Sequence, residues 1–241
     1  MEKHIKSTSR RTGKELYEQL RTAVICYQLP PQQHLQVMNL ARRLGVSTTP
    51  VRETLNRLYA EGLLAFEPNK GFSIKPLDPR EMIEAYQCNF LILKHAIEAN
   101  AAKLETITIE PPVDALGEQH AQAAAKPYAS FVENLYVDIA LLSGNRLMVE
   151  IVRRCNARTH YVRFLDLKEP KTLARVHRDV LHFLQVVKSG NAAAAVSHLE
   201  CQLARALKVI PYLVGNAMID LAKQAGGEAN GTPNAIRNTT S

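Results

Sequence analysis

The spacing of apolar residues in the first third of the chain is typical of short helices followed by a hairpin. Apolar positions recur every three or four residues in three successive segments, which indicates amphipathic helices. Gly45 ends the second segment and Ser47 caps the third, because these residue types favour helix C-termini and N-termini respectively. Alternating strand-like residues then flank the turn sequence Pro68-Asn69-Lys70-Gly71. The pattern predicts helices over 13–27, 37–44 and 47–62 and a hairpin over 63–77.

The remaining two thirds of the chain show helical periodicity and no strand-like alternation of useful length. Asp78 and Pro79 begin a long helix, since aspartate caps helices and proline is favoured in their first turn. The turns Ser143-Gly144-Asn145 and Ser189-Gly190-Asn191 separate later helices. This half is therefore predicted to be an all-α bundle. The expected helices span 79–104, 113–125, 128–142, 146–165, 171–188 and 192–223, with a linker over 106–112.

The order of the N-terminal segments is that of a winged helix-turn-helix. In such a domain the start of the third helix enters the major groove of DNA, and here it presents short polar side chains and an arginine. The hairpin tip, with Lys70 and Gly71, suits close contact with a phosphate backbone. The predicted fold is mainly α: a flexible basic start (1–12), a winged helix-turn-helix (13–77), an all-helical domain (78–224) and a disordered tail (225–241).

The charge of the chain is concentrated where the pattern places this DNA-binding fold. Residues 1–80 contain 13 Lys and Arg against 7 Asp and Glu, a net charge of +6 out of a total of +7. A local positive field favours a polyanionic partner, because neutralising phosphates contributes much of the affinity for DNA. The sequence therefore predicts double-stranded DNA as a partner.

Other classes of protein are disfavoured by what the sequence lacks. No apolar run approaches roughly 18–20 residues and the N-terminus has no apolar h-region, so neither a membrane span nor a secretory signal is expected. The four cysteines show no CxxC spacing, which is typical of reduced thiols in a cytoplasmic protein. A glycine-rich phosphate loop, a nucleophile elbow and an HExxH motif are all missing, so we do not expect an enzyme.

The stretch LARRLGVSTTPVRETL (40–55), followed by Glu61-Gly62-Leu63 and Gly71, resembles the GntR family of bacterial regulators. In that family the serine of the turn, the residues after it and the arginine of the Pro-Val-Arg sequence contact operator DNA. Most members have arginine where this chain has Thr48, so its operator preference is expected to differ from theirs. The DNA contacts that the resemblance implies are Ser47, Thr48, Thr49, Arg52 and Arg42, with Lys70 and Gly71 at the wing.

The helical half is similar, over roughly residues 80–215, to the FCD-type effector domain of the FadR subfamily. The similarity rests on the helix order and on the two Ser-Gly-Asn turns. In many such domains an aspartate and three histidines bind a divalent metal that helps to hold a small carboxylate. The corresponding positions here are Val132, Tyr136, Val180 and Gln202, none of which is a usual metal ligand. The resemblance thus implies that the metal ligands are replaced, and no cofactor is expected.

These replaced positions allow more than one interpretation. In the first, the pocket persists and binds an effector without metal, with Lys94, Tyr136 and Gln202 as polar contacts in a cavity walled by Val132 and Val180. Lys94 takes the position of an arginine that often meets the effector in this class. In the second, these are ordinary core or surface residues and sensing happens elsewhere. In the third, the alignment shifts by one helical turn and a rearranged metal site uses histidines of the last two helices, which are His177, His182 and His198.

The function predicted from these patterns is sequence-specific transcriptional regulation. We expect a cytoplasmic homodimer that represses a catabolic operon by binding an inverted-repeat operator. A small organic acid or aromatic metabolite would then release it from the DNA. The alternative is a DNA-binding dimer whose helical domain only dimerises and senses no ligand.

Overall fold

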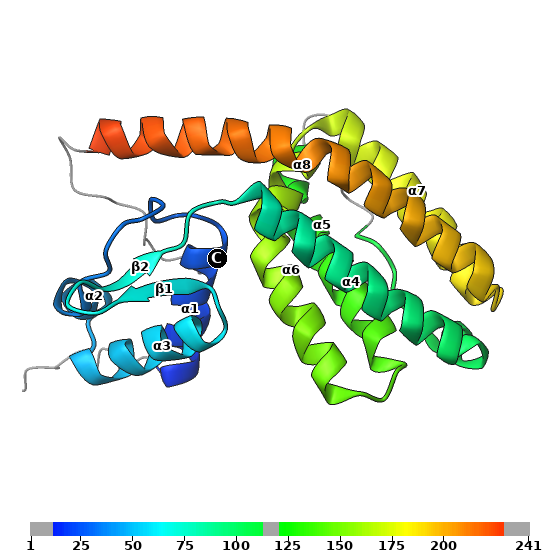
Figure 1. Cartoon of the computed structure of the whole chain (residues 1–241), viewed down its shortest axis with the longest axis horizontal. Helices are drawn as coiled ribbons and strands as arrows, with labels where there is room; N and C mark the ends of the chain where they lie inside the picture. The colour runs from blue at the N-terminus through cyan, green and yellow to red at the C-terminus, as the bar shows by residue number, and fades with distance from the viewer. Residues whose placement is uncertain (1–11, 113–120, 229–241) are drawn as a thin grey trace, which may run out of the picture. The chain divides into compact units, whose positions relative to one another are not determined.

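The computed structural model describes residues 12–112 and 121–228. The chain divides into two compact units, one up to Pro76 and one spanning Leu77–Lys223. It is mainly helical, as predicted, and its strands, β1 (Leu64–Glu67) and β2 (Gly71–Ile74), lie in the first unit (Figure 1). Among the described residues, no helix combines the length and the apolar character that crossing a bilayer requires.

The first unit is a winged helix-turn-helix, which confirms the predicted order of elements. A capping box between Thr12 and Glu15 fixes the start of the first helix. This helix ends at Ile25 and not at residue 27, because Tyr27 takes a left-handed φ of 48° that a helix cannot accommodate. The elements are α1 (Gly13–Ile25), α2 (Val37–Leu44), α3 (Thr48–Ala60), β1 (Leu64–Glu67) and β2 (Gly71–Ile74).

The turn between α2 and α3 depends on Gly45. This residue has a φ of 68° and its N–H donates to the last turn of α2, so it is the left-handed C-cap that the sequence predicts. Beyond the turn, α3 directs its apolar side into the domain: Val51, Leu55 and Leu58 are completely buried. Because one side of α3 is fixed in the core, its polar side is held outward.

β2 pairs with two segments of the chain. On one side it forms an antiparallel hairpin with β1, in which Leu64 pairs with Ile74. On the other side residues 32–35 run along β2, with a bridge between His34 and Ser73 and a hydrogen bond of 2.8 Å from the Leu35 N–H to the Phe72 carbonyl. This extra pairing is absent from the sequence prediction, because residues 32–34 are polar and show no strand-like alternation.

The second unit is a helical bundle, also as predicted. Its largest completely buried side chains include Tyr128 of α5 and Phe183 of α7. α6 packs against both α4 and α5 (Figure 1). The elements are α4 (Pro79–Ala99), the 3₁₀ helix η1 (Ala101–Thr106), α5 (Ala121–Leu141), α6 (Arg146–Leu167), α7 (Pro170–Lys188) and α8 (Ala192–Glu228).

The helices of this domain differ most from the sequence prediction at three places. α4 ends at Ala99 because the Asn100 side chain donates to the Ala96 carbonyl and the chain tightens into η1. α5 continues through Pro127, where a break was predicted, because complete burial of Ala125 and Tyr128 offsets the cost of about 3 kcal/mol that a proline inside a helix imposes. α8 runs through Pro211, as the predicted helix does, and continues to Glu228, beyond the predicted end at residue 223. The start of the helix predicted over 113–125 and most of the predicted tail lie outside the described residues.

Candidate DNA-binding surface and cavity of the helical domain

The exposed start of α3 presents the side chains that the sequence assigns to DNA contact. Ser47, Thr48, Thr49 and Arg52 are all exposed. Ser47 occupies the N-cap position in extended backbone, but its side chain makes no capping hydrogen bond. The first-turn N–H groups of a helix have no partner within the helix, so this end suits a phosphate oxygen. Arg42, on α2, is exposed as well.

The wing turn has the geometry that its sequence predicts. Pro68 is followed by Asn69 with a φ of 67°, and the Lys70 N–H donates to the Glu67 carbonyl at 3.1 Å. Proline and then a residue of positive φ are the marks of a type II turn. The next residue, Gly71, has a φ of 83°, which side chains other than glycine rarely adopt.

Lys70 at the wing is already paired within the protein. Its Nζ lies 2.8 Å from Glu67 Oε2, and both side chains are exposed. The hydrogen bond with Lys70 lowers the pKa of Glu67, and the same bond raises the pKa of Lys70. Glu67 therefore competes with a phosphate for Lys70, a feature that the sequence analysis missed.

Arg57, which the helix pattern leaves on the outer side of α3, is held in a structural cluster. Its guanidinium lies 3.6 Å from the centroid of the Tyr17 ring, and Nε lies 3.2 Å from Glu61 Oε1. The Tyr17 hydroxyl donates to Glu61 at 2.7 Å, and burial together with Glu61 raises the pKa of Tyr17 to about 12. Arg57 thus ties α3 to α1.

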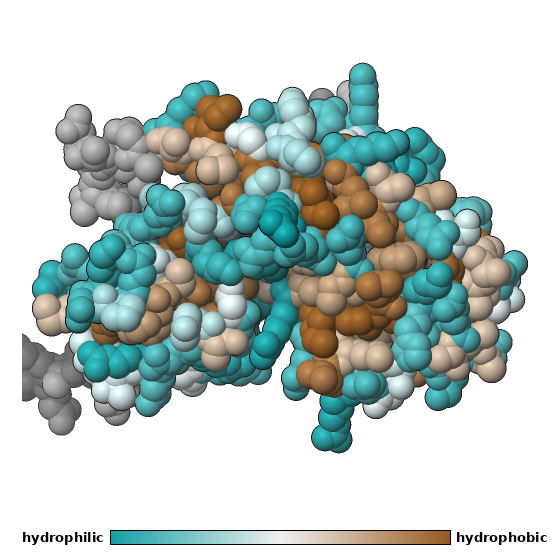
Figure 2. All heavy atoms as spheres, viewed as in Figure 1, coloured by the Kyte–Doolittle hydropathy of each residue, from teal (hydrophilic) through white to brown (hydrophobic). Residues whose placement is uncertain are grey.

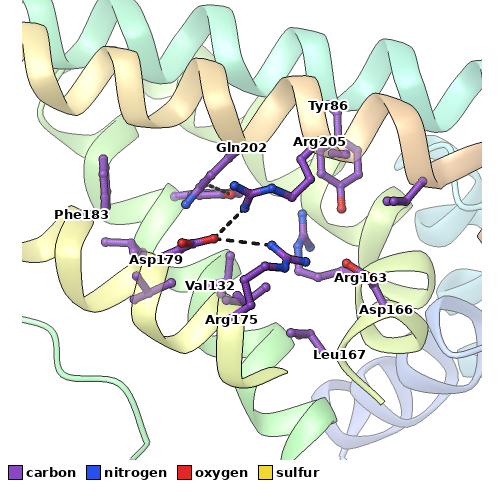
Figure 3. Close-up of a pocket in the computed structure, with 16 residues that line it drawn as sticks. Tyr86, Val132, Arg163, Asp166, Leu167, Arg175, Asp179, Phe183, Gln202 and Arg205 are labelled. Atoms are coloured by element: carbon purple, nitrogen blue, oxygen red, sulfur yellow. Dashed lines mark hydrogen bonds and ion pairs between the residues drawn. The ribbon is translucent and has the colours of Figure 1, made fainter. Parts of the chain in front are cut away.

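The helical domain contains a cavity of about 100 Å³ with walls from α4, α5, α6, α7 and α8. Figure 3 shows charged side chains from several helices directed into it. Four of the five residues predicted to bind an effector line this cavity: Val132, Tyr136, Val180 and Gln202.

The fifth predicted residue, Lys94, does not line the cavity. Its side chain is 38% exposed, and Nζ lies 3.8 Å from Glu200 Oε1 and 3.9 Å from Glu98 Oε1. Its position on α4 directs the side chain toward these carboxylates at the surface. Sequence reasoning missed the cations that do line the cavity, which are Arg163, Arg175 and Arg205.

Two of these arginines converge on one carboxylate. Asp179 Oδ2 lies 2.6 Å from Arg205 Nη1 and 3.5 Å from Arg175 Nη1 (Figure 3). Arg175 and Asp179 are four residues apart on α7, whereas Arg205 reaches across from α8. A guanidinium has five N–H donors, so each arginine keeps donors beyond those used by Asp179. Only the pair on α7 has a spacing that the sequence could have revealed.

Arg163 is a buried cation at another wall of the cavity. Its Nη1 lies 2.5 Å from Glu133 Oε1, and its guanidinium faces the rings of Tyr86 and Tyr136 at 5.5 and 5.8 Å. Desolvation alone would lower the pKa of Arg163, but Tyr86, Glu133 and Tyr136 outweigh it and raise that pKa. Burial raises the pKa of Tyr136 to about 12, so its hydroxyl remains a neutral donor. Arg163 therefore adds a permanent positive charge to the lining.

The histidines considered for a rearranged metal site have other contacts. His177 Nδ1 lies 3.2 Å from the Tyr128 hydroxyl, and burial lowers the pKa of His177. The rings of His182 and His198 lie 5.6 Å apart, and His198 Nε2 lies 2.9 Å from the Gln202 side-chain nitrogen. Within residues 12–112 and 121–228, no three His, Cys, Asp or Glu side chains are grouped so that they could hold a metal ion.

Known proteins resemble this chain over most of its length. Residues 12–74 match the model of the family "Bacterial regulatory proteins, gntR family". The Nta operon transcriptional regulator of Aminobacter aminovorans is 26% identical over 189 residues, which cover 77% of this chain and 90% of that protein. The HTH-type transcriptional regulator YdhC of Bacillus subtilis is 26% identical over 195 residues, covering 77% and 84%. The names of these relatives agree with the expectation of a regulator and not of an enzyme.

Solved structures show the same fold. A putative GntR transcriptional regulator from Rhodococcus sp. RHA1 superposes with a TM-score of 0.64 at 18% identity, covering 82% of this chain and 96% of that one. McbR/YncC of Escherichia coli superposes with a TM-score of 0.55 at 19% identity, covering 88% and 98%. The winged helix and the helical domain of this chain thus occur together in other regulators.

Proposed function

We propose that this chain is a DNA-binding transcriptional regulator of the GntR family, whose model its first domain matches, and that its helical domain senses a small organic or aromatic acid in the cavity. The proposal rests on one observation above all: Arg175 and Arg205 reach from two helices toward Asp179 in the lining of one cavity. Arginine pairs of this kind bind carboxylates through several charge-assisted hydrogen bonds. The effector then changes the affinity of the regulator for DNA.

The size and charge of the cavity support an effector of this class. Its volume of about 100 Å³ is of the same order as cavities that accept a single benzene ring. Three arginines and two aspartates line it, so the polar lining carries more positive than negative charge. Apolar residues, among them Val132 and Val180, form the other walls. A small acid with an apolar body fits this lining, and an acyl-coenzyme A is too large for it.

We further propose that the effector binds without a metal ion. The four positions that correspond to metal ligands in FCD-type domains line this one cavity, which supports the resemblance to that class. Valine, tyrosine and glutamine are poor ligands for a divalent metal. Arginines supply the positive charge in its place, and they are always protonated. The carboxylate would displace or share the contacts that Asp179 now makes.

In this proposal the regulator is a homodimeric repressor that reads an inverted repeat. A two-fold dimer presents two copies of α3 to successive major grooves, with Arg52 at a base edge. Large apolar side chains are exposed on the helical domain: Leu91 of α4 and Leu147 of α6 are each 63% exposed. Figure 2 shows apolar residues gathered over α4 and the helices beside it, which is typical of a surface that a second subunit covers.

The alternative function, a helical domain that only dimerises, is favoured by one observation. Asp179 already accepts hydrogen bonds from both arginines, so their charge is partly neutralised without a ligand. Under this alternative, the three side chains are a structural ion-pair network that joins α7 to α8.

A thermal-shift screen against small carboxylic acids separates the two functions. We expect at least one acid to raise the melting temperature of the wild-type protein, since a ligand that binds only the folded state stabilises it. Arg175→Ala and Arg205→Ala should lose most of that shift. Lys94→Ala is the matched control, because it removes a cation of α4 that does not line the cavity. If no acid stabilises the wild type, or if the arginine variants respond as it does, the sensing function is wrong.

A further inference from the structure

A second, smaller cavity adjoins the first one. It has a volume of about 40 Å³, and Tyr86, Tyr136 and Gln202 line both cavities. The walls that it does not share are one amide, Asn89, and four apolar side chains. Those apolar side chains are Phe90, Leu93, Leu199 and Leu203.

Asn89, which lines this second cavity, has a side-chain acceptor without a partner. The residue is 3% exposed, and its Nδ2 donates to Asn156 Oδ1 at 2.9 Å. Within the described residues, no group donates a hydrogen bond to Asn89 Oδ1. Buried polar atoms almost always have a partner, so an exception of this kind points to a bound group.

Two consecutive hydrogen bonds, which begin at the Glu133 carbonyl, fix the orientation of the Asn89 amide. Asn156 Nδ2 donates to the Glu133 carbonyl at 3.0 Å, and a carbonyl can only accept. Asn156 must therefore turn its oxygen toward Asn89, which must in turn direct its nitrogen toward Asn156. The oxygen of Asn89 is left without a donor, and the amide cannot turn over without losing its hydrogen bond to Asn156.

The neighbouring polar groups do not supply the missing donor. The Tyr136 hydroxyl donates to Gln202 Oε1 at 3.2 Å, and the Gln202 nitrogen lies 2.9 Å from His198 Nε2. Neither group donates to Asn89 Oδ1. A hydroxyl or amino group of a ligand would satisfy Asn89 Oδ1, and a ligand that only accepts would not.

We propose that Asn89 recognises a hydrogen-bond donor on the effector, which is therefore a hydroxy acid or an amino acid and not a simple carboxylic acid. The carboxylate lies with Arg175 and Arg205 in the first cavity, and the hydroxyl or amine lies beside Asn89 in the second. This inference rests on the proposed function, because it places the carboxylate in the first cavity. Asn89 is then a specificity-determining residue, and Asn156 positions it.

Matched pairs of acids that differ by one hydroxyl test this inference. Isothermal titration of the full chain with benzoate, 4-hydroxybenzoate, butyrate and 4-hydroxybutyrate gives a ratio of Kd values within each pair. In the wild type we expect the hydroxy acid of at least one pair to bind about fivefold tighter or more, because it satisfies a buried acceptor. Equal affinities within both pairs would overturn the inference while leaving the sensing function intact. If none of the four acids binds, the inference is contradicted, whereas the thermal-shift screen decides the sensing function.

Two variants separate recognition from a structural role of the amide. Asn89→Leu removes the acceptor, so its ratio for the same pair should fall to about one. Asn156→Leu leaves Asn89 in place but frees its amide to turn over, so the ratio should also fall, although Asn156 does not line either cavity. The ratio compares two ligands on one protein, so a general loss of stability does not change it. A ratio that stays at the wild-type value in Asn89→Leu would contradict the inference.

Discussion

The side-chain nitrogen of Gln202 lies 2.9 Å from Nε2 of His198. Gln202 Oε1 meanwhile accepts a hydrogen bond from the Tyr136 hydroxyl. An amide nitrogen donates, so His198 must accept through an unprotonated Nε2 and carry its proton on Nδ1. The neutral form of His198 thus holds Gln202, and through it Tyr136, in the arrangement that lines both cavities.

This relationship predicts that acid weakens the helical domain. Burial is the main cause that lowers the pKa of His198 below its ordinary value of 6.5, and burial lowers the pKa of His177 as well. The unfolded chain therefore binds these protons more readily than the folded chain. The free energy of unfolding should fall as the pH drops below about 6.5 and should recover as the pH rises.

Urea unfolding between pH 5 and pH 8 measures this dependence. We expect His198→Gln and His177→Gln each to flatten the slope below pH 6.5, and the double variant to flatten it most. His95→Gln is the control, since His95 is exposed on α4. A slope that persists unchanged in the double variant would show that other groups cause it.

Arg52→Ala should abolish most of the binding to operator DNA without unfolding the protein. The side chain is exposed at the start of α3, where a guanidinium can donate two hydrogen bonds to a guanine. Fluorescence anisotropy with a sequence selected from random DNA should show a loss of about tenfold or more in affinity. Arg154→Ala removes the same charge from an exposed site on α6 and should bind nearly as the wild type does. Equal losses in both variants would refute the assignment of Arg52.

Glu67→Gln should strengthen DNA binding. Glu67 now pairs with Lys70 at the wing, so its removal frees that ammonium for a phosphate. The affinity should rise by about twofold at low salt, and the gain should shrink as salt screens the contact. Glu18→Gln, which removes a charge of α1, is the control. An affinity that does not change, or that falls, would exclude Lys70 from phosphate contact.

The thiol of Cys155 should react more slowly with an alkylating agent than the thiol of Cys201. Burial and the neighbouring Cys88 raise the pKa of Cys155 to about 12, so little reactive thiolate exists at pH 8. Cys201 is exposed. In the folded protein, iodoacetamide should modify Cys201 well before Cys155, as followed by peptide mass spectrometry. Similar labelling rates at the two positions would contradict the packing of α4 against α6.

The winged helix could be predicted from the sequence because its signals are local. Gly45 and the turn of Asn69 and Gly71 require backbone conformations that few other residues adopt, and the apolar side of α3 follows from its spacing alone. The pairing of residues 32–35 with β2 joins positions that are distant in sequence, and no residue among them marks a strand. The helix break predicted at Pro127 was also wrong, because tertiary burial outweighed the local cost of the proline.

The cavity was predictable only in part. The resemblance to FCD-type domains identified Val132, Tyr136, Val180 and Gln202 as positions that lie together, because the fold fixes where these positions lie. It could not identify the cations, because the reach of a long side chain depends on the crossing of helices. Arg205 meets Asp179 from a different helix, whereas Lys94 pairs with a glutamate at the surface.

The central claim is that a small acid acts through the two arginines, without metal, to release the regulator from DNA. The most direct test is fluorescence anisotropy of the selected operator with protein treated with a chelator, titrated with an acid that stabilises it. For the wild type we predict that the acid lowers the fraction of bound DNA. For Arg205→Ala we predict a much smaller fall, measured relative to the fraction that this variant binds without acid. An acid that releases both proteins equally, or that releases the wild type only after metal is added back, would contradict the claim.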